Sequence, residues 1–315
     1  MRVIGFLLAA VFGAAVSQAA YDPMAVSEAK VVSETREIRD AKRDRIIPVR
    51  VYLPEKKQVP VILFSHGLGG SRDNNAWLGE HWAKRGYFAV FLQHPGSDDA
   101  VWKEAQTGQR MVNMKSAASF ENLKLRGEDV KAVIDELAVW NKEGEWKDRM
   151  DLQHIGISGH SFGAHTSQIV AGQEFAGGKI SFRDPRVSAA IMMSPAPPAL
   201  GDPAKSFESI RIPCLLLTGT LDESPIGKTT PADRLKVFPS LTNAPAWQIV
   251  FDKATHSSFG GRGNGGYHPD ILALTTAFLD AQLKNDAPAK AWLNGEGAKS
   301  VLSEKDVWQR NERTE

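Results

Sequence analysis

Short apolar runs alternate with amphipathic stretches along most of the chain. After residue 60 each run is four to seven residues long and almost free of polar side chains, which is typical of strands covered on both faces of a sheet. Between the runs, apolar residues recur at helical spacing, most regularly in residues 123–137. This alternation predicts βαβ units and a mostly parallel sheet with helices on both faces.

The boundaries of the predicted elements follow from these runs. Two strands at 31–38 and 46–53 are expected to form an entry hairpin. Further strands are predicted at 61–64, 88–92, 154–157, 187–193, 214–217 and 247–251. Helices are predicted at 77–85, 123–137, 164–171 and 271–283. The charged C-terminal tail, 285–315, is expected to pack loosely on the surface of a single α/β domain that spans 20–315.

The N-terminus has the pattern of an export signal. Arg2 precedes an uncharged apolar run over 3–16, and residues 17–19 have the small-x-small form of a cleavage site. We therefore expect cleavage after Ala19 and a secreted or periplasmic protein; a buried or anchoring N-terminal helix is the alternative. No later segment approaches about 18 uncharged apolar residues, so no stable membrane insertion is expected after cleavage.

Charge and cysteine content exclude several classes of function. Residues 1–19 carry one charge, so the chain from residue 20 onward has 37 basic and 37 acidic side chains. Such a balance gives no global field to attract nucleic acid or an anionic bilayer. The single cysteine, Cys214, excludes an internal disulfide and a cysteine-based metal cluster. It lies in an apolar run and is expected to be a buried strand thiol.

The strongest chemical signal is a G-x-S-x-G motif at 159–163. It follows a predicted strand and precedes a predicted helix, which is the context this motif requires. Glycines are needed there because the turn brings backbone segments too close for a Cβ atom. The turn would expose the Ser161 hydroxyl at the carboxyl edge of the sheet, so Ser161 is predicted to be a nucleophile.

A serine hydroxyl needs a base, and the base needs an acid that orients it. In this fold context the expected chain order is Ser, then Asp or Glu, then His. His256 follows the strand at 247–251 and is the predicted base. Asp222, soon after the strand at 214–217, is the predicted acid. The alternatives are His268 as base and Asp202 as acid, while His165 is expected to be a packing residue.

Two backbone N–H groups are predicted to form an oxyanion hole. One belongs to Phe162, directly after the nucleophile. The other belongs to Leu68, in the glycine-rich loop SHGLGG at 65–70 that follows the strand at 61–64. This loop lacks the glycine spacing and the Lys-Ser/Thr pair of nucleotide-binding loops, which argues against a phosphate site.

Three segments together resemble the platelet-activating-factor acetylhydrolase and dienelactone-hydrolase-like branch of the α/β-hydrolase superfamily. They are SHGLGG at 65–70, GHSFG at 159–163 and GTLD at 219–222, and the resemblance covers residues 30–285. It implies the α/β-hydrolase fold and hydrolysis of short-acyl or lipid-like esters without a metal or other cofactor. Dienelactone hydrolases use a cysteine nucleophile, whereas this chain has Ser161. Polyester-degrading relatives share the same plan, so polymeric esters are also open.

The segment after the strand at 88–92 offers further candidates. His94 lies at the carboxyl edge of the predicted sheet, and Trp102 lies in a long excursion, 96–121; both are candidate substrate-binding residues. The excursion is either a cap over the acyl group or an ordinary surface loop. Because no second set of ligands has helical His spacing, no metal site is expected.

The predicted reaction is acyl transfer to water through an acyl-enzyme, on a small-molecule or polymeric ester. Ser161 would attack the carbonyl while His256 takes its proton. The enzymatic alternative is a serine peptidase or amidase. The non-enzymatic alternative is a binding protein that keeps the fold, although an intact set of Ser161, Asp222 and His256 argues against it.

Overall fold

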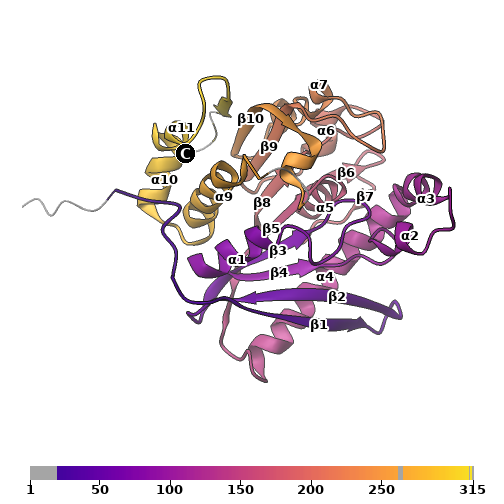
Figure 1. Ribbon diagram of the computed structural model, residues 1–315, viewed down its shortest axis with the longest axis horizontal. Helices are drawn as coiled ribbons and strands as arrows, with labels where there is room; N and C mark the ends of the chain where they lie inside the picture. The colour runs from indigo at the N-terminus through magenta and orange to yellow at the C-terminus, as the bar shows by residue number, and fades with distance from the viewer. Residues whose placement is uncertain (1–19, 262–264, 312, 314–315) are drawn as a thin grey trace, which may run out of the picture.

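Nine strands form one continuous sheet in a computed structural model that describes residues 20–311 and 313, except 262–264 (Figure 1). The predicted export signal lies outside the described residues. The strand order is β1-β2-β4-β3-β5-β8-β9-β10-β11. The strands are β1 Val32–Asp40, β2 Arg45–Leu53, β3 Val59–Ser65, β4 Phe88–Leu92, β5 Met150–His160, β8 Val187–Met193, β9 Cys214–Leu221, β10 Ala246–Thr255 and β11 Val307–Arg310.

The sheet is parallel in its centre and antiparallel at its two edges. β4, β3, β5, β8, β9 and β10 run parallel, whereas β1, β2 and β11 run antiparallel to their neighbours. The entry hairpin and the mostly parallel sheet predicted from the hydrophobic pattern are therefore confirmed. β5 and β10 are longer than the apolar runs suggested, so residues 252–255, which lie beyond the predicted strand at 247–251, continue β10.

Alternating side chains of the central strands bury opposite faces of the sheet. In β3, Val61 and Leu63 enter one core while Ile62 and Phe64 enter the other, as the two-residue period of a strand requires. The first core is closed by α4, α5, α6 and α8, and the second by α1, α9, α10 and α11. This gives three layers, with helices on both sides of the sheet (Figure 1).

The helices fill the connections between strands. Most have clear sequence signals at their ends, such as the Ser119 side chain that caps α4 by accepting from the N–H of Asn122. The helices are α1 Ala76–Arg85, α2 Ala100–Lys103, α3 Arg110–Ala117, α4 Phe120–Lys142, α5 Phe162–Ala171, α6 Pro203–Phe207, α7 Pro231–Arg234, α8 Val237–Ser240, α9 His268–Leu283, α10 Ala287–Asn294 and α11 Gly297–Ser300. A 3-10 turn, η1 His256–Phe259, follows β10, and β6 Glu174–Phe175 and β7 Ile180–Ser181 form a separate small ribbon.

The C-terminal segment does not pack loosely, contrary to the sequence-based expectation. Ala289 and Leu293 of α10 and Ala298 of α11 are fully buried, and β11 pairs with the edge of β10. The apolar residues that anchor this segment are few and widely spaced among charged ones. The hydrophobic pattern of the sequence therefore did not reveal these anchoring residues among the charged ones.

A buried carboxylate ties the N-terminal segment to the second helical layer. Asp280 of α9 accepts hydrogen bonds from the hydroxyls of Tyr21 and Tyr87, both at 2.7 Å, and from Arg85 Nε at 2.8 Å. It also pairs with Lys284 at 2.8 Å. Burial acts to raise the pKa of Asp280, but the charge of Lys284 and these hydrogen bonds outweigh it and leave the pKa below its ordinary value.

Candidate active site

Ser161 lies at a sharp turn between β5 and α5, with backbone angles φ 58° and ψ −115°. A non-glycine residue rarely adopts a positive φ, so the turn is strained. The flanking glycines allow it: a Cβ on Gly163 would lie 1.9 Å from the carbonyl oxygen of Ser65, and one on Gly159 would lie 2.2 Å from that of Gly163. The strand–turn–helix context expected of the motif is present.

The structure brings Ser161, His256 and Asp222 together in one hydrogen-bonded chain. The Ser161 hydroxyl donates to His256 Nε2 at 2.8 Å, and His256 Nδ1–H donates to Asp222 Oδ1 at 2.7 Å. The three residues directly follow β5, β10 and β9, and the carboxyl ends of these parallel strands meet at one edge of the sheet. An ionised carboxylate can only accept, which fixes the His256 proton on Nδ1.

The Asp222 carboxylate is fully buried and held by several donors. Thr218 Oγ1 donates to Oδ2 at 2.9 Å, and Arg234 Nε lies 2.9 Å from Oδ1. Burial acts to raise the pKa of Asp222. The hydrogen bond from His256 and the charge of Arg234 lower the pKa by more than burial raises it, so the pKa falls below its ordinary value. Asp222 therefore stays ionised beside His256 at neutral pH.

Arg234, at the end of α7, was not singled out from the sequence. Its buried guanidinium donates to the carbonyl oxygens of Asp222 and Ser194, both at 2.7 Å, and of Pro195 at 3.1 Å. One of its terminal nitrogens also lies 3.1 Å from His256 Nδ1. Arg234 thus joins the loops that follow β8, β9 and β10. No local motif marks it, because its partners lie 12 to 40 positions away.

The two predicted oxyanion donors, Leu68 and Phe162, lie on the wall of the same cavity as Ser161. Neither N–H donates to any described residue. A Cβ on Gly67 would lie 3.5 Å from Ser161 Cβ, so the glycine-rich loop passes directly beside the nucleophile. Phe162 begins α5, where the first N–H groups have no acceptor within the helix.

The peptide that carries the Leu68 N–H is held through its carbonyl oxygen. The Gly67 carbonyl accepts from His66 Nδ1 at 2.6 Å and from the Gly70 N–H at 3.1 Å. His66 Nε2 accepts from the His94 N–H at 3.1 Å, which places the imidazole proton on Nδ1. In a trans peptide the N–H points away from the preceding carbonyl. The Leu68 N–H consequently points to the side of this peptide opposite His66 Nδ1 and the Gly70 N–H.

The cavity at this edge of the sheet has a volume of about 950 Å³. One wall is apolar and includes Met114, Phe120 and Phe175, and the rings of Phe120 and Phe175 meet edge to face at 5.0 Å. Met114 belongs to α3, so the 96–121 excursion forms part of the wall. His165 also lines it, which corrects the expectation of a packing residue; burial, together with the charge of Arg234, lowers the pKa of His165 to about 4.

The two candidate substrate-binding residues are placed elsewhere, which corrects that prediction. His94 is fully buried: Nδ1–H donates to Asp129 Oδ2 and Nε2 accepts from Ser65 Oγ, both at 3.0 Å. Burial, with the charge of Arg126, lowers its pKa to about 4. Trp102 donates to the Gly69 carbonyl at 2.8 Å and supports the loop from outside. Neither belongs to the described cavity lining.

The alternative residues are not part of the hydrogen-bonded chain. His268 stacks on Trp77 with ring centroids 3.8 Å apart. Asp202 caps α6 by accepting from the Ala204 N–H. Cys214 is fully buried in β9, as expected, and burial raises the pKa of its thiol to about 12.

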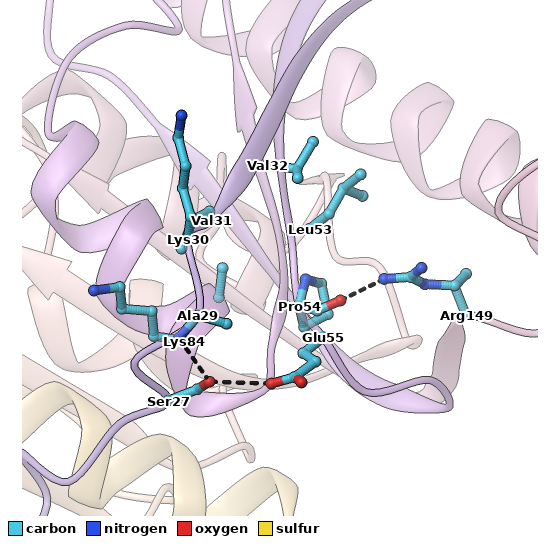
Figure 2. Close-up of a pocket in the computed structure, with 11 residues that line it drawn as sticks. Ser27, Ala29, Lys30, Val31, Val32, Leu53, Pro54, Glu55, Lys84 and Arg149 are labelled. Atoms are coloured by element: carbon cyan, nitrogen blue, oxygen red, sulfur yellow. Dashed lines mark hydrogen bonds between the residues drawn. The ribbon is translucent and has the colours of Figure 1, made fainter.

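A second, smaller cavity, of about 310 Å³, lies between the N-terminal segment, the end of β2 and the end of α1 (Figure 2). Its polar groups bind one another: Ser27 Oγ donates to Glu55 at 3.0 Å, and Arg149 donates to the Pro54 carbonyl. No histidine is among the described residues that line it. It therefore offers Ser27 no imidazole base.

Comparison with known proteins gives no family assignment. No protein-family model matches the chain, and a search of curated proteins found no match. Over the described part of the chain, no group of three or more His, Cys, Asp and Glu side chains is arranged to hold a metal ion. No described helix is long and apolar enough to cross a membrane. The site is thus defined by its geometry alone.

Proposed function

We propose that this protein is a serine-dependent carboxylic-ester hydrolase of the α/β-hydrolase superfamily. The observation that carries the proposal is the hydrogen-bonded chain Ser161–His256–Asp222, with contacts of 2.8 and 2.7 Å, opening into the 950 Å³ cavity. Two unpaired N–H groups beside Ser161 add the electrostatic element that acyl transfer requires. The resemblance of the three sequence motifs supports the same conclusion.

The reaction follows from these positions. Ser161 Oγ attacks the ester carbonyl carbon while its proton passes to His256 Nε2, and the carbonyl oxygen becomes an oxyanion held by the N–H groups of Leu68 and Phe162. Collapse of this intermediate breaks the ester bond, and His256 gives its proton to the leaving alkoxide. Water, deprotonated by His256, then attacks the acyl carbon; collapse of this second intermediate breaks the bond to Ser161 Oγ, which takes the proton back from His256, and the acid is released. Asp222 stabilises the imidazolium at both stages.

The size and the lining of the cavity favour uncharged or lipid-like ester substrates. Its size falls in the range of small-molecule sites, and Met114, Phe120 and Phe175 offer an apolar wall for an acyl chain. Among the described residues that line it the one arginine is Arg234, which already pairs with the Asp222 carboxylate and donates to three carbonyl groups. Esters are favoured over amides because an alkoxide or phenoxide leaves with less help than an amine.

A panel of p-nitrophenyl esters of increasing acyl length, with a p-nitroanilide as the amide control, tests the proposal. We expect ester turnover that Ser161→Ala abolishes and that His256→Ala reduces by several orders of magnitude. His268→Ala is the matched control and should retain turnover. Faster cleavage of the anilide would indicate a peptidase or amidase. If no ester or anilide of the panel is hydrolysed, the result would favour a binding protein with this fold.

A further inference from the structure

Arg126 is a fully buried arginine in the second turn of α4. Its Nε donates to Ser97 Oγ at 2.8 Å, and one terminal nitrogen donates to the His66 carbonyl at 2.7 Å. The other terminal nitrogen donates to the Ser97 carbonyl at 3.3 Å. These acceptors are all neutral. Within the described part of the chain Arg126 forms no ion pair with a carboxylate.

A buried cation without a paired carboxylate is costly. Burial lowers the pKa of Arg126 to about 9, against the opposing effect of the charges of Asp129 and Asp98. The guanidinium is nevertheless charged at neutral pH. A side chain that only filled space in this core would not need the charge, so its contacts point to a more specific role.

Those contacts reach both predicted donors of the oxyanion hole. The His66 carbonyl begins the loop that carries Leu68, and the Ser97 carbonyl that Arg126 binds also accepts the Gly69 N–H at 2.9 Å. Arg126 therefore fixes the backbone on both sides of Leu68. On its other side the guanidinium lies over the Phe162 ring, with its carbon 4.5 Å from the ring centroid, a favourable cation–π distance.

We propose that Arg126 is the positioning residue of the oxyanion hole. It clamps the glycine-rich loop against the start of α5, so that the N–H groups of Leu68 and Phe162 stay aimed at one point beside Ser161. The guanidinium is absent from the cavity lining, so it acts through these two residues and its buried charge. This inference rests on the proposed ester hydrolysis.

The test compares Arg126→Met with the wild-type full-length chain. Preorganised donors act on the transition state and hardly on the bound ester. We therefore expect kcat, per active site titrated with a p-nitrophenyl phosphonate, to fall about 50-fold, less than the roughly 100- to 1000-fold for loss of an oxyanion donor because both N–H groups remain in the chain, while KM stays within about threefold. Affinity for an aryl trifluoromethyl ketone, which adds to Ser161 as a tetrahedral oxyanion, should fall with kcat.

Two further variants keep the test decisive. Arg126→Lys preserves the charge and the aliphatic stem but lacks the planar fork whose three nitrogens each hold a separate acceptor. It should lose about tenfold in kcat and serves if Arg126→Met fails to fold. Arg186→Met is the control. Arg186 directly precedes β8, at the amino end of this strand and away from the carboxyl end that leads to the candidate active site, and it pairs with Asp184 and with Asp135 of α4. It should leave kcat unchanged.

The outcomes separate this inference from the proposed function. If the wild-type protein neither hydrolyses esters nor reacts with the phosphonate, the proposed function fails. If the wild type is active but the titrated kcat of both Arg126 variants stays within threefold of it, the positioning role is wrong and Arg126 is structural. A rise in KM with unchanged ketone affinity would equally overturn it.

Discussion

Replacing Arg234 by Met should weaken both the fold and the candidate active site. Arg234 is the only side chain described here that contacts Asp222, His256 and the loop after β8 together. Methionine fills part of the same volume but donates no hydrogen bonds. The change leaves the carbonyl groups of Asp222, Ser194 and Pro195 without this donor, and the buried carboxylate of Asp222 without its cation.

The size of the effect can be worked from these contacts. Breaking a buried ion pair costs about 3–5 kcal/mol, and each buried carbonyl left without a donor costs about 1–3 kcal/mol unless it finds another. Because the cavity lies alongside and water can reach the carbonyls, we expect the free energy of unfolding to fall by about 3–5 kcal/mol. Asp222 still binds His256 and Thr218. The loss in kcat should therefore be about 10- to 100-fold, below the roughly 10⁴-fold loss for a disabled triad acid.

Urea unfolding followed by tryptophan fluorescence gives the first quantity, and ester hydrolysis per titrated active site gives the second. Lys236→Met is the matched control, because exposed Lys236 pairs with no described carboxylate other than Asp233 at the surface, an interaction worth about 0–1 kcal/mol. In Arg234→Ala, millimolar guanidinium should restore part of kcat, since Arg234 lines the cavity. An unfolding free energy within 1 kcal/mol of wild type together with an unchanged kcat would refute this reasoning.

Two further substitutions test the sharp turn at Ser161 and the buried Asp280 carboxylate that holds the N-terminal segment. Gly163→Ala should abolish titratable active sites, because its Cβ would lie 1.9 Å from the Ser65 carbonyl oxygen; normal titration and kcat would contradict the described turn. Asp280→Asn should cost about 3 kcal/mol at pH 7, since it breaks a buried charged network. The folded-state pKa of Asp280 is lowered, so its contribution is complete above the unfolded value near 3.9 and is lost as pH falls through the folded pKa. Urea unfolding of both forms from pH 7 to pH 3 should show the difference shrinking below about pH 4, and a constant difference would count against it.

The parts of the fold set by local sequence could be predicted. The apolar runs identify the central strands because a strand covered on both faces carries few polar side chains. The turn around Ser161 is marked by two glycines whose replacement would cause backbone clashes. The positions of Asp222 and His256 at strand ends follow from the order of the elements, because parallel strands bring their carboxyl ends to one edge.

The contacts between distant side chains could not be predicted. Arg126 binds a carbonyl 60 positions away and Arg234 one 40 positions away, and no spacing rule relates such partners. His94 follows a strand at the expected edge, but the sequence does not say which way a loop side chain turns. In the structure it turns inward, because Asp129 and Ser65 satisfy both its nitrogens.

Reaction with a fluorophosphonate shows whether Ser161 is an activated nucleophile. The full-length protein would be treated with the reagent, its intact mass measured, and the modified peptide mapped. We expect one phosphonyl group per chain, attached to Ser161, slow labelling in His256→Ala, and none in Ser161→Ala. Absence of labelling of the folded wild-type protein, or equal labelling of Ser161→Ala, would show that Ser161 is not an activated nucleophile.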